Sequence, residues 1–220
     1  MKIKLFSISI LAVAMSVTVV KAQLGSHIGF NVGPSFGTLY GNNGTDNLRG
    51  HTGFAAGLTY QYAFSTAFAL HTGLLYESKG ASQRTTIDPF DIDVRTNYNY
   101  NYLTIPVLFR AHLIPDKKLR PFINAGPYFA FLTRQMTVVR TENGDDYDVN
   151  RYNNTNDYKG FDIGLSAGVG IDYLITDMIH LDFEIRDNLG LFNISESSND
   201  NARLKNNSLN FLIGMQFSIH

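Results

Sequence analysis

Residues 161–173 read Phe-Asp-Ile-Gly-Leu-Ser-Ala-Gly-Val-Gly-Ile-Asp-Tyr, and their hydropathy alternates without a fault. Every odd position is apolar, whereas every even position is Gly, Ser or Asp. A period of two places successive side chains on opposite faces of a β-strand. This stretch is therefore predicted to be one strand with an apolar face and a second face that is small and polar.

The same alternation recurs along most of the chain. The closing segment 209–219 has Leu209, Phe211 and Ile213 on one face, opposite Asn210 and Gly214 on the other. Six further segments follow the pattern with lapses, at 28–40, 53–64, 68–79, 102–113, 120–134 and 178–189. Together with residues 161–173, these segments predict eight strands.

The connections between the predicted strands alternate in length. Three are short, at 65–66, 114–119 and 175–177. Four are long and rich in Asn, Asp, Ser and Thr, at 41–52, 80–101, 135–160 and 190–207. Short turns at one end and long polar loops at the other are typical of outer-membrane barrels. We therefore expect an all-β fold, an eight-stranded antiparallel up-and-down transmembrane β-barrel, with both termini periplasmic and four loops outside.

The composition of the two faces separates a membrane barrel from a soluble, lipocalin-like one. A soluble barrel exposes a face rich in Lys and Glu to water and encloses its apolar face. Here the second face is dominated by Gly, Ser, Asn and Gln, which suits a narrow lumen, and the apolar face suits lipid. Aromatic residues near strand ends are expected to form interfacial girdles. They are Tyr40, Tyr60, Tyr62, Phe64, Tyr76, Phe129, Phe131 and Tyr173.

Composition excludes several classes of function. The 220 residues hold 18 Lys plus Arg and 19 Asp plus Glu, so no charge excess favours a nucleic-acid partner. The absence of cysteine excludes disulfides, thiolate metal sites and a cysteine nucleophile. A mean hydropathy of −0.09 argues against helical membrane spans, but alternating strands average to near zero.

Residues 1–22 are predicted to be a signal peptide. Lys2 and Lys4 precede an apolar run over 5–20, and Val20-Lys21-Ala22 forms a small-residue cleavage site. The run is shorter than the ~20 residues that a membrane-spanning helix needs. The predicted domains are the signal peptide and a barrel domain over 23–220.

Most strand charges fall on the predicted lumen side. They are His71, Glu77, Arg110, His112, Asp172, His180, Asp182, Glu184 and Arg186, with Lys79 and Asp162 on the same side. One hypothesis is an acid–base relay of histidines and carboxylates. The favoured interpretation is a structural network of ion pairs that neutralise one another, because isolated buried charges are costly. A lumen of eight strands is just filled by side chains, so we do not expect a channel.

No catalytic, cofactor or metal site is predicted from motifs. The chain has no Gly-x-Ser-x-Gly elbow, and its histidines show no i,i+2 or i,i+4 pairing. Asp145, Asp146 and Asp148 lack the spacing of an EF-hand and are interpreted as a solvated loop. Because some eight-stranded barrels modify lipids, a lipid-modifying enzyme stays open as the least favoured function.

The long loops carry tyrosines among Asn and Asp, which is a composition that recognition surfaces use. The candidates for binding a protein partner are Tyr98, Tyr100, Tyr147, Tyr152 and Tyr158. The alternative is that these segments extend the strands beyond the membrane, with Asn143-Gly144 as a hairpin turn.

Two segments carry a family resemblance. Tyr102-Leu103-Thr104-Ile105-Pro106-Val107-Leu108 and Pro121-Phe122-Ile123-Asn124-Ala125-Gly126-Pro127-Tyr128 resemble the PorT-like outer-membrane β-barrel family of Bacteroidetes. This resemblance implies the barrel fold over nearly all of 24–220. It also implies, as an alternative function, an accessory role in protein secretion through the type IX system. The leading hypothesis is a non-enzymatic outer-membrane barrel with a plugged lumen, in contact with membrane lipid, which contributes to envelope integrity or binds a partner through its loops.

Overall fold

The computed structural model describes residues 25–41, 48–87, 92–143, 146–195 and 203–219. Its strands are β1 (Ser26–Gly41), β2 (Arg49–Ala63), β3 (Phe68–Ile87), β4 (Ile92–His112), β5 (Leu119–Asn143), β6 (Asp146–Asn153), β7 (Phe161–Thr176), β8 (Ile179–Gly190) and β9 (Leu204–Ile219). A single 3-10 turn, η1 (Thr155–Asp157), follows β6. Within these ranges, no helix is long and apolar enough to cross a membrane. The predicted signal peptide lies outside the described residues.

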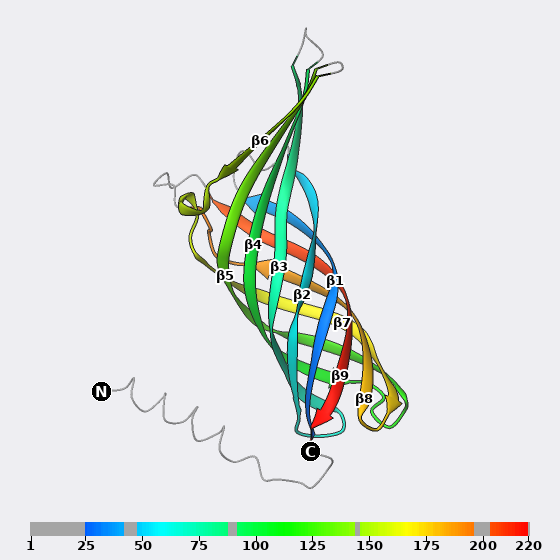
Figure 1. Ribbon diagram of the computed structural model, residues 1–220. Coiled ribbons are helices and arrows are strands. Elements are labelled where there is room, and N and C mark those ends of the chain that lie inside the picture. The colour runs from blue at the N-terminus through cyan, green and yellow to red at the C-terminus, as the bar shows by residue number, and fades with distance from the viewer. Residues whose placement is uncertain (1–24, 42–47, 88–91, 144–145, 196–202, 220) are drawn as a thin grey trace, which may run out of the picture.

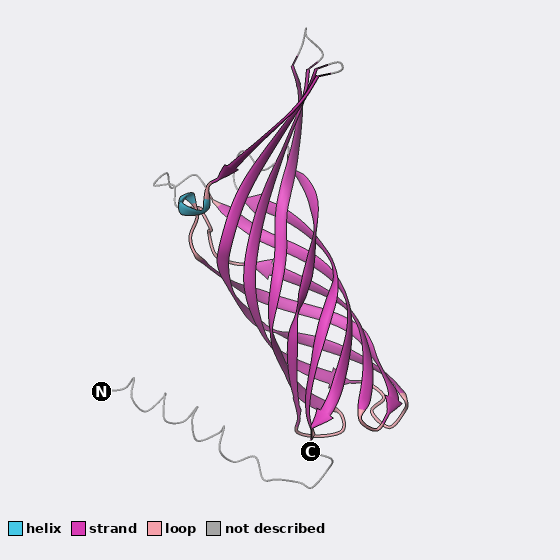
Figure 2. Ribbon diagram, in the orientation of Figure 1, coloured by secondary structure: helices cyan, strands magenta, loops and turns pink. Residues whose placement is uncertain are grey.

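Eight of the strands form a closed antiparallel ring, and β6 stands outside it (Figures 1 and 2). Each ring strand pairs with its neighbours in sequence, β5 pairs with β7, and β1 closes the ring by pairing with β9 from Ser26–Ile219 to Gly41–Leu204. Closure leaves no unpaired strand edge in the ring, which is what a barrel in lipid requires. The prediction of an eight-stranded up-and-down barrel is confirmed.

The short connections lie at one end of the barrel, together with the start of β1 and the end of β9 (Figure 1). Side-chain hydroxyls stabilise two of these turns. Ser65 Oγ accepts a hydrogen bond of 2.9 Å from the Phe68 N–H, and Thr176 Oγ1 accepts one of 3.1 Å from the Ile179 N–H. Such local bonds favour turns over continued strand.

Two of the long connections are strands rather than the predicted loops. β3, β4 and β5 continue far beyond the ring, and β6 pairs with β5 from Met136 to Asn143 (Figure 1). We call this part the extension: residues 82–87 of β3, 92–97 of β4, 136–143 of β5, and all of β6. The loop prediction for 80–101 and 135–160 is therefore wrong for most of each segment. The alternative of strand extensions is confirmed, whereas the predicted Asn143-Gly144 turn falls at residues 144–145, outside the described residues.

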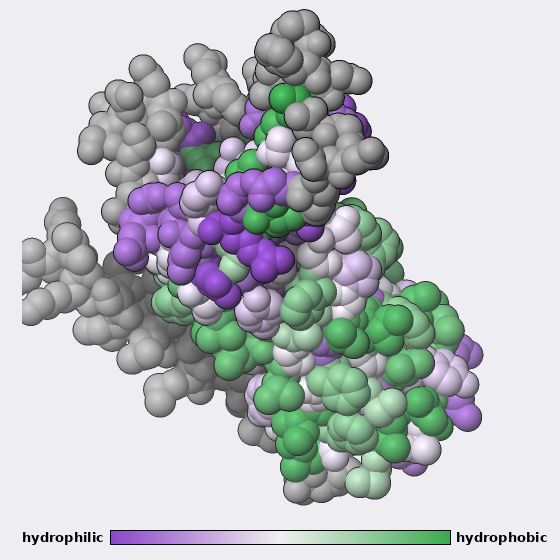
Figure 3. Space-filling model, turned by 45° about the horizontal axis from the view of Figure 1, so that its top comes forward, coloured by the Kyte–Doolittle hydropathy of each residue, from purple (hydrophilic) through white to green (hydrophobic). Residues whose placement is uncertain are grey.

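The outer face of the ring is an apolar belt. Large hydrophobic side chains are exposed on all eight ring strands, for example Leu58, Val169, Leu165 and Ile213, which are 70%, 56%, 53% and 52% exposed. Figure 3 shows this belt in green over the barrel, with purple hydrophilic residues where strands continue beyond it. A continuous apolar surface of this size does not face water in a soluble monomer. The belt is the face that meets lipid.

Candidate functional site

The lumen is the densest polar region of the protein. All nine residues of the predicted polar network lie buried on the inner face of the ring, as do Lys79 and Asp162. Among the buried side chains described, the largest include Arg110, Arg186, Tyr128 and Lys79. The structure thus places the sequence-derived set together and shows how its members are paired.

Nearest the short turns, the lumen is organised around Asp172. Arg120 Nη2 lies 2.5 Å from Asp172 Oδ2, and the rings of His112 and His180 each approach this carboxylate to 3.4 Å. His27 packs edge-on against His180, with ring centroids 4.9 Å apart. One buried carboxylate therefore accepts contacts from strands β4, β5 and β8.

The middle of the lumen is held by Arg110. Its guanidinium lies 2.9 Å from Asp182 and 3.2 Å from Glu184, and it stacks 3.8 Å above the centroid of the Phe122 ring. Glu184 also receives Arg186 Nε at 2.5 Å. Arg110 therefore joins β4 to β8 across the barrel, two strands that share no backbone hydrogen bonds, whereas Arg186 pairs with Glu184 within β8.

Toward the other end, Glu77 accepts hydrogen bonds from three of the surrounding strands. Its donors are Thr104 at 3.0 Å, Asn188 at 3.0 Å, Ser208 at 2.7 Å and Asn210 at 2.9 Å. Lys79 Nζ lies 3.3 Å from Glu77 and 4.6 Å from the centroid of the Tyr128 ring. The buried lysine is compensated both by a carboxylate and by an aromatic face.

Two glycines on the inner face make room for aromatic rings. A Cβ at Gly164 would overlap the Tyr128 ring and the Leu189 carbonyl, and one at Gly170 would overlap the Phe122 ring and the Phe183 carbonyl. The lumen is therefore filled by rings that occupy the space that side chains at these positions would take. This close approach explains why the small face of residues 161–173 is rich in glycine.

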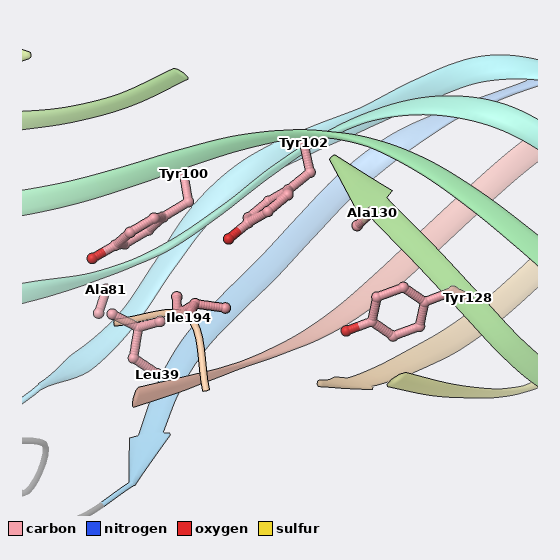
Figure 4. Packing of buried hydrophobic residues seen from close by; sticks show 7 residues of the cluster. All are labelled: Leu39, Ala81, Tyr100, Tyr102, Tyr128, Ala130 and Ile194. Atoms are coloured by element: carbon pink, nitrogen blue, oxygen red, sulfur yellow. The ribbon is translucent and has the colours of Figure 1, made fainter. Parts of the chain in front are cut away.

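An apolar cluster closes the lumen at the end opposite the short turns (Figure 4). Its buried members are Leu39, Ala81, Tyr100, Tyr102, Tyr128, Ala130 and Ile194. Ile194 comes from the segment after β8. Backbone hydrogen bonds join this segment to the start of β9 and to the residues before β7. The Ile194 N–H donates to the Leu204 carbonyl at 2.8 Å, and the Lys159 N–H donates to the Ile194 carbonyl at 2.9 Å.

The tyrosines proposed for recognition divide into two groups. Tyr100 is only 1% exposed and packs edge-on against Tyr158, with centroids 4.9 Å apart, and Tyr98 packs against the same cluster. Tyr100 therefore does not contribute to an external surface, because alternation along β4 carries it onto the inner face, whereas Tyr98 and Tyr158 are only partly buried. Tyr152 on β6 is 52% exposed. Tyr147 pairs with Glu142, and its side chain lies outside the described residues.

The lumen brings charges of both signs together in near balance. Four bases, Lys79, Arg110, Arg120 and Arg186, meet five acids, Glu77, Asp162, Asp172, Asp182 and Glu184. The acids are held by arginine, lysine or amide donors. No group of three or more His, Asp or Glu residues within the described ranges could hold a metal ion.

Sequence analysis missed several inward residues. Arg120, Phe122 and Tyr128 all lie on the lumen side of β5, and Arg120 and Tyr128 contact Asp172 and Asp162. The signal was available, because these positions share the even numbering of Asn124, which points inward. The segment 120–134 has apolar residues at both parities, which hid the alternation.

A closed ring with an apolar exterior and a packed polar interior defines the class: a transmembrane β-barrel. The chain matches the model of the outer membrane protein beta-barrel domain family over residues 21–196, and it belongs to that family. This membership supports location in the outer membrane. No protein of curated function matches the chain in sequence.

Solved structures of outer-membrane proteins are similar to this chain at low sequence identity. Neisserial surface protein A is 12% identical, with 88% of this chain and 97% of that chain covered and a TM-score of 0.50. OprG of Pseudomonas aeruginosa is 11% identical, with 91% and 99% covered and a TM-score of 0.46. The Escherichia coli outer membrane protease OmpT is 10% identical, with 93% and 99% covered and a TM-score of 0.39. At such identities the likeness concerns the fold alone, and it assigns no activity.

Proposed function

We propose that this protein is a non-enzymatic outer-membrane barrel that acts at the cell surface through its extension, with the lumen serving as a structural core. The observation that carries the proposal is the contrast between the two regions. The lumen is filled by paired charges and closed by the apolar cluster, whereas the extension carries four strands far beyond the apolar belt.

The proposed orientation follows from the signal peptide and the lengths of the connections. Export through the inner membrane would deliver residues 23–220 to the periplasm, where short turns are the usual connections of such barrels. The short turns, the start of β1 and the end of β9 would then lie in the periplasm. The extension, with η1 and the segment around Ile194, would lie outside the cell.

The absence of enzymatic activity is proposed from the geometry of the polar groups. Catalysis by His with Asp or Glu needs a group that can reach a substrate. Asp172, His112 and His180 are buried, and Glu77, Asp182 and Glu184 are enclosed by their hydrogen-bond donors. A lipid-modifying activity would require one of these groups to meet the membrane face.

A tipless variant tests the role of the extension. Ser82 and Asn97 face each other across β3 and β4, so an Asn-Gly turn that joins them would remove residues 83–96, the β3–β4 half of the extension, while retaining the ring. The variant should still migrate differently on a gel before and after boiling, as closed barrels do. In a deletion strain with a weakened envelope, the wild-type gene should restore detergent resistance and the tipless gene should not. Full restoration by a folded tipless barrel would contradict the proposal.

An accessory role in protein secretion is the second candidate. It is supported by the PorT-like resemblance, whose two segments lie on the paired strands β4 and β5, where Pro106 of one segment pairs with Tyr128 of the other. This role predicts that a deletion strain loses secreted cargo and retains precursors in the periplasm. An unchanged set of secreted proteins would remove it, and unchanged lipid A would likewise remove the lipid-modifying alternative.

A further inference from the structure

The outer face of the extension carries a row of arginines at the same height on three neighbouring strands. Arg84 on β3 lies directly opposite Arg95 on β4, and Arg95 lies directly opposite Arg140 on β5. Directly paired residues project from the same face of a sheet, about 5 Å apart, and like charges in such pairs are destabilising. This row therefore has an electrostatic cost that nothing in the barrel fold requires.

Acidic neighbours balance only part of this charge. Asp93 pairs with Arg84 and accepts a 2.9 Å hydrogen bond from Thr86, and the Arg84 guanidinium holds the pKa of the Asp93 carboxyl below its usual range. Among the described residues, Arg95 and Arg140 form no ion pair. Arginine stays protonated at any physiological pH. Three arginines thus share two acids on this face, Asp93 and Glu142, which lie directly opposite each other.

A pocket lies at one end of the row. Pairing of β2 with β3 is interrupted between Gly50 and Ala55, while β2 keeps its pairing with β1. The gap leaves a cavity of about 260 Å³ lined by polar residues, among them Arg49, His51, Arg84, Arg95 and Asn97. Burial lowers the pKa of the His51 imidazole, so His51 is neutral at pH 7 and the arginines set the charge of the pocket.

The chemistry of the pocket selects a class of ligand. Guanidinium groups bind phosphate oxygens through two parallel N–H donors, and Ser82 and Asn97 add neutral hydrogen-bonding groups beside them. Because Arg140 continues the row beyond the pocket, the surface suits several anionic groups on one molecule better than a single small anion. The hydroxyls of a sugar match the neutral groups, and its phosphate esters match the arginines.

We propose that the pocket between β2 and β3, with the row Arg84, Arg95 and Arg140, is a binding site for phosphorylated carbohydrate. This proposal deepens the proposed surface function by naming the chemistry that the extension recognises. The ligand approaches from the outer face of the extension, on the side that continues the apolar belt. Phosphorylated sugars of neighbouring lipopolysaccharide and soluble phosphorylated sugars are two sources of the same group.

The test is calorimetric titration of the full-length mature barrel, folded in a non-ionic detergent, with inositol hexakisphosphate as the probe. We expect saturable binding that weakens as salt rises from about 0.1 M, because the site is exposed and screened. Unphosphorylated inositol should not bind. Arg95→Gln and Arg140→Gln should each weaken binding about tenfold, the loss expected for one charge-assisted hydrogen-bonding group.

The matched control is Arg203→Gln, which removes the same charge from an exposed residue before β9, away from the pocket. Its affinity for inositol hexakisphosphate should equal that of the wild type. Equal weakening by Arg203→Gln and Arg95→Gln would show attraction to net charge alone and would overturn the site. The site would also be overturned if inositol hexakisphosphate does not bind to wild-type barrel whose migration on a gel changes on boiling, as expected of the folded protein.

A competition arm identifies the source of the ligand. Displacement of the bound probe by vesicles that contain phosphorylated lipopolysaccharide, but not by vesicles with dephosphorylated lipopolysaccharide, would assign the site to membrane carbohydrate. Failure of both vesicles to displace a bound probe would assign it to a soluble sugar. Failure of the probe to bind leaves the proposed surface function intact, because the tipless variant tests that function separately.

Discussion

Arg110→Met removes the charge that holds two carboxylates at the centre of the lumen. In the wild type the Arg110 guanidinium lies 2.9 Å from Asp182 and 3.2 Å from Glu184, with all three side chains at most 1% exposed. After the change Glu184 keeps Arg186, but Asp182 keeps only the amide of Gln216 as a side-chain donor. Breaking a buried pair by removing one partner costs ~3–5 kcal/mol. Methionine replaces much of the lost volume, so we expect a loss of this size in the free energy of unfolding.

The assay is unfolding of the mature barrel by urea in detergent, followed by loss of the fast-migrating folded band on a gel. Arg84→Met is the matched control, because Arg84 also pairs with a carboxylate, Asp93, but on the exposed extension. The Arg84→Met variant should have almost the same urea midpoint as the wild type, since exposed ion pairs contribute little to the free energy of unfolding. Asp182→Asn introduced with Arg110→Met should recover part of the loss, because it removes the uncompensated charge.

The outcome that refutes the reasoning is equal stability of Arg110→Met and Arg84→Met. Such equality would mean that water reaches Asp182 and solvates it, so that the lumen is an aqueous space rather than a core. If Arg110→Met is destabilised and Asp182→Asn restores none of the lost stability, the loss arises from packing around Phe122 rather than from charge.

Three further predictions concern the two faces and the plug. Leu165→Lys places a charge on the lipid-facing belt and should cost ~2–4 kcal/mol near the membrane centre, whereas Ser166→Ala, which removes a 2.6 Å lumen hydrogen bond to Asn188, should cost ~1 kcal/mol; a urea midpoint for Leu165→Lys no lower than that of Ser166→Ala would contradict the placement of Leu165 in lipid. Gly170→Ala should destabilise the barrel by ~1–3 kcal/mol because the new methyl group meets the Phe122 ring and the Phe183 carbonyl, while Gly160→Ala, with no atom within 4 Å of its Cβ, should leave the urea midpoint in place. Ile194→Asp puts a charge into the apolar cluster and should make the segment after β8 sensitive to protease in intact folded barrels; unchanged cleavage would show that Ile194 does not hold this segment.

The ring strands were predictable because each has a single apolar face that must meet lipid. Leu165 and Ile213 alternate with Ser166 and Gly214, and one residue of slippage would invert every side chain. The charged lumen residues could be named from the same parity. Their partners could not, because contacts such as Arg110 with Asp182 cross the barrel between strands 72 residues apart in sequence.

The sequence allowed the extension only as an alternative to loops, for a physical reason. Beyond the membrane both faces of a strand can meet water, so residues 82–87 have no alternation in hydropathy and the alternation over 90–95 is short. Tyr100 illustrates the consequence: a Tyr-Asn alternation over 98–102 suggested a recognition loop, although it continues the inward face of β4. The arginine row was equally invisible, because Arg84, Arg95 and Arg140 meet only through strand register.

The central claim is that the lumen is a closed structural core, and ionic conductance tests it most directly. Mature protein that has been shown to be folded by its heat-modifiable migration is inserted into planar lipid bilayers, and current is recorded under an applied voltage. We expect that insertion leaves the bilayer current at its baseline, because charged side chains and the apolar cluster fill the barrel. Stable, reproducible current steps from the wild-type barrel would contradict it.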